Sequence, residues 1–381
     1  MREGRIVLSP GPVHVSPSQW EGLRHLHHRS DEFRTIVRET EGMIQELIGT
    51  DSPVYSISAS GTGGMEFAAT NMTSPGYTVL VVSGGKFGDR WAELCGAYGC
   101  RVNHVQLPPG VAIDVGNIVE RVRAYGPDIL ALTHVESSTG LRAPIEELIG
   151  ALPEPRPVIM LDSIASVGAE SLSMDAWGID AVVAASQKAF AAPPGASFVV
   201  LSPRAQKLTQ IVNRRHLYYF SLRRYEEGRQ KGDTPFTPAI HTMQIMHRSL
   251  RRIQEIGWER VRERHRRASR AFIEAAAHLS LKSLPENPSD AVQVFKIPDG
   301  YGPADLVGEL AEREGLIVAG GQGQLAGKVV RTGFLGLHGG KTLERAIDSI
   351  ARVVAQGGCV VDAGAARRAM EVISDQEDLF L

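Results

Sequence analysis

From Pro53 onward the chain alternates short apolar runs with helical stretches, and this alternation constrains the fold more than any other feature. Several of the apolar runs contain almost no polar residue, as is typical of strands that helices cover on both faces. Strands that alternate with helices predict an α/β fold with a mostly parallel sheet. We expect strands at 54–58, 77–82, 102–107, 129–133, 158–162, 181–185 and 197–201, with helices at 62–72, 89–97, 115–124 and 146–152.

A different pattern begins near residue 241, where apolar positions recur at helical spacing. Met246, Leu250, Ile253, Gly257 and Val261 form a stripe that predicts one long helix of about five turns. Its other faces are rich in arginine, but glutamates are interleaved with these arginines. This favours a solvated helix between two domains over a helix that binds nucleic acid.

Beyond this helix the pattern predicts a smaller α+β domain. Strands are expected at 291–297 and 315–318, and helices at 303–313 and 341–355. The predicted organisation is therefore an N-terminal segment (1–15), a large domain (16–256) and a small C-terminal domain (257–381).

Composition excludes several classes of partner. The 41 Lys and Arg residues nearly balance 43 Asp and Glu, which argues against nucleic acid or an anionic membrane surface as a main partner. No apolar run reaches the ~18 residues of a membrane-spanning helix. Three cysteines without a CxxC pair favour a reducing compartment, so we expect a cytoplasmic protein. His25, His27 and His28 lack accompanying ligands in the sequence, and no metal site is predicted.

Two residues at strand ends carry the strongest chemical signal. Asp162 ends one apolar strand, and Lys188 follows the end of another. Ligands of open α/β sheets gather outside the carboxyl ends of the strands, so both side chains are expected to face one crevice. Pyridoxal phosphate requires this combination, because a lysine forms its Schiff base and a carboxylate keeps its pyridine nitrogen protonated.

A candidate phosphate site lies between the first expected strand of the sheet and the helix that follows it. Ser60, Gly61 and Thr62 offer hydroxyls and close backbone approach at the start of that helix, where free N–H groups attract anions. The segment matches neither the dinucleotide-binding GxGxxG motif nor the P-loop. A tight turn capped by a serine or threonine is an equally good interpretation of this segment taken alone.

Together these segments resemble the class V aminotransferases of fold type I, and most closely the alanine–glyoxylate and serine–pyruvate aminotransferases. The resemblance covers about residues 8 to 355 in the family's order. Its specific parts are Ser186-Gln187-Lys188 and the Asp-Ser-x-Ala-Ser block that begins at Asp162. The matching segments are 10–12, 28–33, 85–91, 132–140, 161–166, 186–195, 234–238 and 327–333.

The resemblance implies a pyridoxal phosphate enzyme with a large, mostly parallel domain and a smaller C-terminal domain. Lys188 would bind the cofactor and move the proton at the substrate's α-carbon, and Asp162 would pair with the pyridine nitrogen. Phe87 stands at the ring-stacking position, which is often Trp in the family; a phenyl ring stacks but supplies no N–H. The other implied cofactor contacts are Ser60, Gly61, Thr62 and Gln187 around the phosphate, Ser137 near the ring hydroxyl, and Ile164.

Further implied residues concern the partner subunit and the substrate. Thr237, together with Thr234, would reach the phosphate from a neighbouring subunit, which makes a homodimer part of the site. Some relatives carry Tyr at the position of Thr234. Arg331 would bind the substrate carboxylate through its planar fork, and Gly11 would lie close to the substrate.

The predicted function is transfer of an amino group from a small amino acid of the alanine or serine type to glyoxylate or pyruvate by a ping-pong mechanism. One alternative is a 2-aminoethylphosphonate–pyruvate transaminase. A lyase or cysteine desulfurase ranks lower because the small-domain stretch 319–327 contains no cysteine. A non-catalytic binding protein of this fold is disfavoured by the presence of Lys188, Asp162 and Arg331 together.

Overall fold

A computed structural model describes residues 5–212, 217–302, 305–336 and 338–377. Its main feature is a seven-stranded sheet in the order β2-β10-β9-β8-β5-β3-β4. The contacts between β9, β8, β5, β3 and β4 are parallel, whereas β10 runs antiparallel to both of its neighbours. The strands are β2 (Val54–Ile57), β3 (Thr78–Ser83), β4 (Arg101–Gln106), β5 (Ile129–Thr133), β8 (Val158–Asp162), β9 (Ala181–Ala185) and β10 (Ser197–Leu201).

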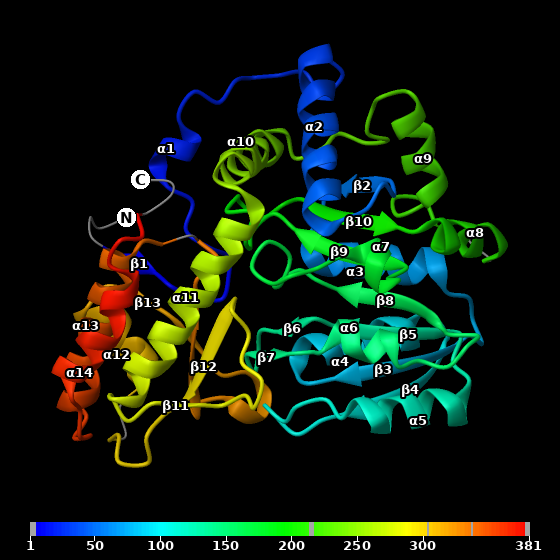
Figure 1. The fold of residues 1–381 in the computed structure, drawn as a ribbon. Coiled ribbons are helices and arrows are strands. Elements are labelled where there is room, and N and C mark those ends of the chain that lie inside the picture. Colours follow the sequence, from blue (N-terminus) through cyan, green and yellow to red (C-terminus); the bar gives the residue numbers. More distant parts are fainter. Residues whose placement is uncertain (1–4, 213–216, 303–304, 337, 378–381) are drawn as a thin grey trace.

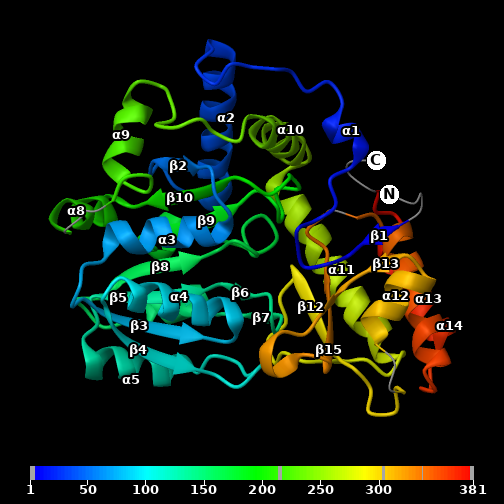
Figure 2. The same ribbon diagram turned by 180° about the vertical axis from the view of Figure 1, so that it is seen from behind.

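Helices cover both faces of this sheet because successive strand residues point to opposite sides. In β8, Ile159 and Leu161 pack into one core, while Val158 and Met160 pack into the other. The helices of the first core are α2 (Asp31–Ile48), α5 (Val115–Tyr125), α6 (Ile145–Gly150), α7 (Met174–Trp177) and α10 (Ile240–Ile256). Those of the second are α3 (Gly61–Met72), α4 (Lys86–Ala97), α8 (Pro203–Ile211) and α9 (Leu222–Gln230). Thus α6 and α7 lie in front of the sheet in the view of Figure 1, and α3 and α4 lie in front of it in the opposite view of Figure 2.

The predicted α/β class with a mostly parallel sheet is confirmed. All seven strands expected in this region are present, and β5, β8, β9 and β10 have the predicted bounds. The helices α3, α4, α5 and α6 overlap the four helices expected between the strands.

A second, antiparallel sheet has the order β11-β12-β15-β14. Its strands are β11 (Lys282–Ser283), β12 (Val292–Lys296), β14 (Ala319–Gly320) and β15 (Val329–Gly333). A separate hydrophobic core joins β12 and β15 to α11 (Trp258–Ala277), α12 (Leu306–Arg313), α13 (Gly340–Gln356) and α14 (Ala363–Met370). The boundaries predicted for the two domains remain a prediction.

The N-terminal segment ties this second sheet to the large one. Its strand β1 (Ile6–Val7) pairs in parallel with β13 (Leu316–Ile317), and the backbone of Gly333 donates a hydrogen bond to Leu8. A few residues later, the N–H of Val13 donates to the carbonyl of Gln187. Residues 8–13 therefore run from one sheet to the loop that carries Lys188.

The single long helix expected across residue 257 is wrong. The structure ends α10 at Ile256 and starts α11 at Trp258. Gly257 between them has a φ of +99°, a conformation that glycine adopts freely and that cannot continue a right-handed helix. Figure 1 shows the two helices meeting at an angle. Met246 and Leu250 pack into the first core of the large sheet, whereas Ile253 and Val261 pack into one small cluster across the break.

The remaining elements are short. They are α1 (Pro17–Trp20), β6 (Val135–Glu136), β7 (Leu141–Arg142) and the 3₁₀ turns Gly323–Leu325 and Glu371–Ile373. Of the helices in the described ranges, none combines the length and apolar character needed to cross a membrane.

Candidate active site

A pocket of about 190 Å³ lies at the carboxyl ends of the parallel strands. Asp162 is the last residue of β8, and Lys188 follows the adjacent parallel strand β9. Both side chains line the pocket, as their positions at strand ends predict. The other predicted residues that line it are Gly11, Ser60, Gly61, Thr62, Phe87, Ser137, Ile164 and Gln187.

The Asp162 carboxyl group is buried at the base of this pocket and is 4% exposed. Burial raises its pKa to about 7, although the backbone N–H of Ile164 donates to Oδ1 at 2.9 Å and favours the charged form. Nearby Glu136 raises the pKa further, whereas Lys188 and Arg90 lower it. A cation placed beside Asp162 would therefore restore its charge.

The Lys188 amino group lines the same pocket from the loop that follows β9. Its Nζ donates to the carbonyl of Pro10 at 2.5 Å. Burial lowers the pKa of Lys188 to about 8; Asp162 opposes this shift and Arg331 adds to it. An amine with a depressed pKa is more often neutral near pH 7 and is a better nucleophile.

Gly11 leaves room for the lysine. A Cβ at this position would lie 2.7 Å from the Nζ of Lys188, and the φ of +119° is one that L side chains rarely adopt. Gly11 thus lies against the Lys188 side chain, and its expected closeness to the substrate stays a prediction. Next to Lys188, the buried Oε1 of Gln187 has no hydrogen-bond partner among the described residues, so a polar group remains for a ligand to satisfy.

The predicted phosphate site is the N-terminus of α3. Ser60 is the N-cap residue, and its side chain makes no capping hydrogen bond. The N–H groups of the first helical turn have no partner within a helix, which suits an anion. Gly61 packs against Ile164, since a Cβ on Gly61 would lie 2.6 Å from the Cδ1 of Ile164.

Arg90 belongs to this site, although sequence reasoning did not select it. Its Nη1 donates to the Thr62 hydroxyl at 2.7 Å, and its guanidinium lies 4.9 Å from the centre of the Phe87 ring. Arg90 also lines the pocket and places a positive charge near the N-terminus of α3. Its spacing of three residues from Phe87 on one helix was the available signal.

Glu136 is a second residue that sequence reasoning missed. It is buried, and its Oε2 accepts the backbone N–H groups of Phe87 at 3.0 Å and Gly88 at 2.9 Å. Its other carboxylate oxygen accepts the backbone N–H and the hydroxyl of Ser138. Burial raises the pKa of Glu136, and these four donors oppose that shift. Glu136 therefore fixes the start of α4, which carries Phe87 into the pocket.

Arg331 lies in β15 of the second sheet and is outside the residues that line the pocket. It is 7% exposed; its Nε donates to the carbonyl of Gly320 at 2.7 Å and its Nη1 to the carbonyl of Ser137 at 2.9 Å. In the described parts of the chain, no carboxylate lies within 4.0 Å of its guanidinium. Burial lowers the pKa of Arg331. A buried cation without an ion-pair partner indicates a place for an anionic ligand.

Thr234 and Thr237 lie apart from this chain's own pocket. Thr234 lines a different pocket of about 240 Å³, and its hydroxyl donates to the carbonyl of Phe236 at 2.8 Å. Thr237 is exposed. Their predicted contacts come from a neighbouring subunit, so this placement leaves that prediction untested.

Comparison with known proteins identifies the family. The sequence profile described as "Aminotransferase class-V" matches residues 16–334. The chain belongs to the class V aminotransferase family. This match confirms the resemblance found in the sequence. The relatives of this aminotransferase carry several different names.

The chain is 32% identical to a protein named soluble hydrogenase, small subunit, of Synechococcus sp., over 94% of this chain and 95% of that one. It is 31% identical to L-aspartate–glyoxylate aminotransferase of Paracoccus denitrificans, with 87% and 86% of the two chains covered. Among solved structures, an alanine–glyoxylate aminotransferase from Nostoc sp. matches with a TM-score of 0.85 and 27% identity, covering 92% of this chain and 95% of that one. The predicted fold, that of the pyridoxal phosphate aminotransferases, is confirmed by this similarity.

Proposed function

We propose that this enzyme uses pyridoxal phosphate to move an amino group from a small amino acid of the alanine or serine type to glyoxylate or pyruvate. The main observation in support of this proposal is that the side chains of Lys188 and Asp162 line the same pocket. The buried guanidinium of Arg331, which has no carboxylate within 4.0 Å among the described residues, supports a substrate that carries a carboxylate. Relatives named aspartate–glyoxylate and alanine–glyoxylate aminotransferases support the two classes of substrate.

The pocket fits pyridoxal phosphate by shape and by polar groups. Phe87 and Ile164 offer apolar contacts for a ring, and the N-terminus of α3 with Thr62 and Arg90 suits a phosphate. The buried Oε1 of Gln187, which no described residue hydrogen-bonds, can accept a hydrogen bond from a ligand. When bound, the cofactor supplies an electron sink for the bond broken at the substrate's α-carbon and carries the amino group between substrates.

The residues of the chain have distinct tasks in this reaction. Lys188 would hold the cofactor and would move a proton at the substrate's α-carbon, for which its lowered pKa is suited. Asp162 would hold a proton on the pyridine nitrogen, because its carboxylate is buried and a nearby cation would stabilise its charged form. The carbonyl of Pro10 orients the amino group of Lys188.

A panel of amino donors tests the function. Alanine, serine, aspartate and 2-aminoethylphosphonate are each assayed against glyoxylate, pyruvate and 2-oxoglutarate with the purified, cofactor-loaded enzyme. We expect the largest kcat/KM for a small α-amino acid with glyoxylate or pyruvate. A preference for the aminophosphonate would replace the proposed donor while leaving the aminotransferase reaction in place.

Arg331→Lys tests the carboxylate site. Both substrates of a ping-pong transaminase present a carboxylate beside the reacting carbon, so the guanidinium of Arg331 can bind the donor and then the acceptor. Lysine keeps the charge but loses the planar two-point contact. A charge-assisted hydrogen bond contributes about 1.5–3 kcal/mol, so kcat/KM should fall roughly 10- to 150-fold in each half-reaction. Single-turnover kinetics of the two half-reactions measure this.

The cofactor content of Arg331→Lys should stay at the level of the unmodified enzyme. A loss in one half-reaction only, or release of the cofactor, would contradict a shared carboxylate anchor. The one-sided loss is what an aminophosphonate donor predicts.

The homodimer is also part of the proposal. Tyr218 and Tyr219, which precede α9, are 65% and 39% exposed, and exposed aromatic residues of this kind mark interaction surfaces. Thr237 would reach the partner's cofactor from this side. Sedimentation should show a dimer, and a fully active monomer would refute the composite site. We place the enzyme in the cytoplasm, which its three free cysteines support.

A further inference from the structure

The segment 233–239, which links α9 to α10, is held at several points. At its end, the backbone N–H of Ala239 donates to the Ser58 hydroxyl at 3.0 Å. In its middle, the Phe236 ring stacks on Tyr219 with centroids 4.7 Å apart and planes 15° apart. These contacts attach the end of the segment to the residue that follows β2 and its middle to a tyrosine before α9, and they leave its start to be held by other groups.

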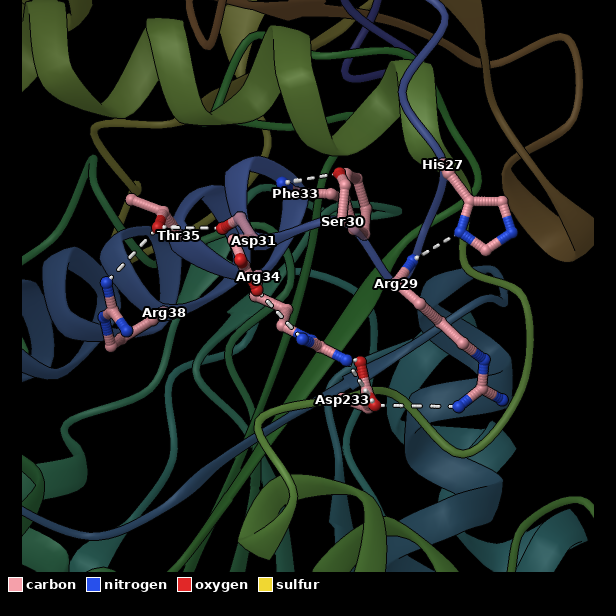
Figure 3. A network of polar contacts seen from close by, with 9 residues as sticks. All are labelled: His27, Arg29, Ser30, Asp31, Phe33, Arg34, Thr35, Arg38 and Asp233. Atoms are coloured by element: carbon pink, nitrogen blue, oxygen red, sulfur yellow. Dashed lines mark hydrogen bonds and ion pairs between the residues drawn. The ribbon is translucent and has the colours of Figure 1, made fainter.

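Two arginines hold the start of the segment through Asp233, as Figure 3 shows. Arg34 in the first turn of α2 donates from Nε to Oδ1 at 2.9 Å and from Nη2 to Oδ2 at 3.2 Å. Arg29, in the turn before α2, brings its Nη1 within 3.6 Å of Oδ2. The remaining nitrogen of Arg34, Nη1, donates to Asp31 at 3.0 Å, but the Asp31 side chain is fully in solvent and makes no contact with Asp233.

This ion pair differs from ordinary surface pairs. The side chain of Asp233 is 10% exposed and that of Arg34 is 35% exposed. Two parallel N–H···O bonds add geometric restraint as well as energy, whereas most exposed pairs contribute little. The hydrogen bond from Arg34 lowers the pKa of Asp233, so the carboxylate is charged across the neutral pH range. The restraint acts on the residue directly before Thr234.

The Arg34–Asp233 ion pair, called the clamp below, does not contact the cofactor pocket of its own subunit. Neither Arg34 nor Asp233 lines the pocket that contains Lys188. The Thr234 hydroxyl is engaged with the carbonyl of Phe236, whereas the exposed Thr237 side chain has no hydrogen bond to any described residue. Thr237 is therefore the group of this segment that is available to a second chain.

We propose that Arg34 and Asp233 are positioning residues, whose two-point ion pair holds the segment 233–239 so that Thr237 contacts the cofactor phosphate bound in the partner subunit. This inference rests on the proposed function and names how the dimer completes the phosphate site. It predicts that breaking the clamp weakens binding of the phosphate group and leaves binding of the ring unchanged.

The test compares two cofactor forms on the full-length dimer. Pyridoxal phosphate and pyridoxal, which lacks the phosphate, are titrated separately, and the near-visible absorbance of the lysine-bound form gives both dissociation constants. Thr237→Ala should reduce the preference for the phosphorylated form by about tenfold or more, as expected for a lost charge-assisted hydrogen bond. Asp233→Asn and Arg34→Lys should reduce the preference by about tenfold, while the affinity for pyridoxal changes less than twofold.

Asp31→Asn is the matched control. It removes a carboxylate that contacts the same arginine and does not touch Asp233. Its preference between the two cofactor forms should equal that of the unmodified enzyme. The double variant Asp233→Asn/Thr237→Ala should be no worse than Thr237→Ala alone, because both changes act on one contact.

The outcomes separate this inference from the proposed function. If Asp233→Asn lowers the affinities for both forms equally, or adds fully to Thr237→Ala, the clamp is only structural and the inference is overturned. The proposed function would still hold in that case. If the unmodified enzyme binds no pyridoxal phosphate at Lys188, the proposed function fails, and the inference fails with it.

Discussion

Lys188→Ala is expected to abolish transamination while the protein still folds and dimerises. The variant loses both the attachment of the cofactor and the base that moves the proton at the α-carbon. Proton transfer by a positioned group alone contributes about 10²- to 10⁴-fold, so the rate should fall by at least the upper part of that range. Steady-state assays and near-visible absorbance measure the two losses, and borohydride reduction of the unmodified enzyme followed by peptide mass analysis should place the cofactor on Lys188.

Lys207→Ala is the control for this change, since Lys207 is an exposed lysine of α8 outside the pocket. It should keep full activity and absorbance. Turnover by Lys188→Ala near the normal rate, or a cofactor found on another lysine, would remove Lys188 from the proposed role.

Asp162→Asn should lower kcat by about 10²- to 10³-fold, the range found when one preorganised electrostatic partner of a developing charge is removed. An amide carries no negative charge, so the pyridine nitrogen loses the group that keeps it protonated. Cofactor content should remain near that of the unmodified enzyme, because Lys188 and the N-terminus of α3 are untouched. Steady-state kinetics with the best donor, together with the absorbance of bound cofactor, measure both quantities.

A second readout distinguishes electrostatics from misfolding. Asp162 raises the pKa of Lys188, so Asp162→Asn should lower the pKa of that amine in the cofactor-free enzyme. The pH dependence of its reaction with an amine reagent reports this shift. Asp299→Asn, which changes an exposed aspartate, should alter neither measurement. An unchanged kcat in Asp162→Asn would assign the proton-holding role to another group.

The sequence predicted the large sheet well because its signal is local. Buried strands such as β5 and β8 are continuous apolar runs, and their polar ends follow directly from the chain. Asp162 and Lys188 stand at the ends of two such runs, so their common edge of the sheet could be inferred without coordinates. Their roles, and that of Arg331, rest on the family resemblance and stay predictions until the variants are measured.

Contacts between distant segments could not be predicted in this way. The carboxylate of Glu136 meets the backbone of Phe87 and Gly88, and Arg331 meets the carbonyl of Ser137, 194 residues away in the chain. Such pairings depend on how segments far apart in the chain pack against each other. The apolar stripe across Gly257 failed for a related reason, because helical spacing says nothing about a backbone turn at a glycine.

The sequence by itself determined the α/β alternation, the two strand-end residues and the family, since each depends on residue type and spacing along the chain. The tertiary structure alone decided that Arg331 is buried with no carboxylate partner among the described residues, that Arg90 donates to Thr62, and that Arg34 pairs with Asp233. The physical reason is that burial and charge pairing are properties of space. They are set when segments far apart in the chain exclude water between them, and no local pattern records which segments will meet.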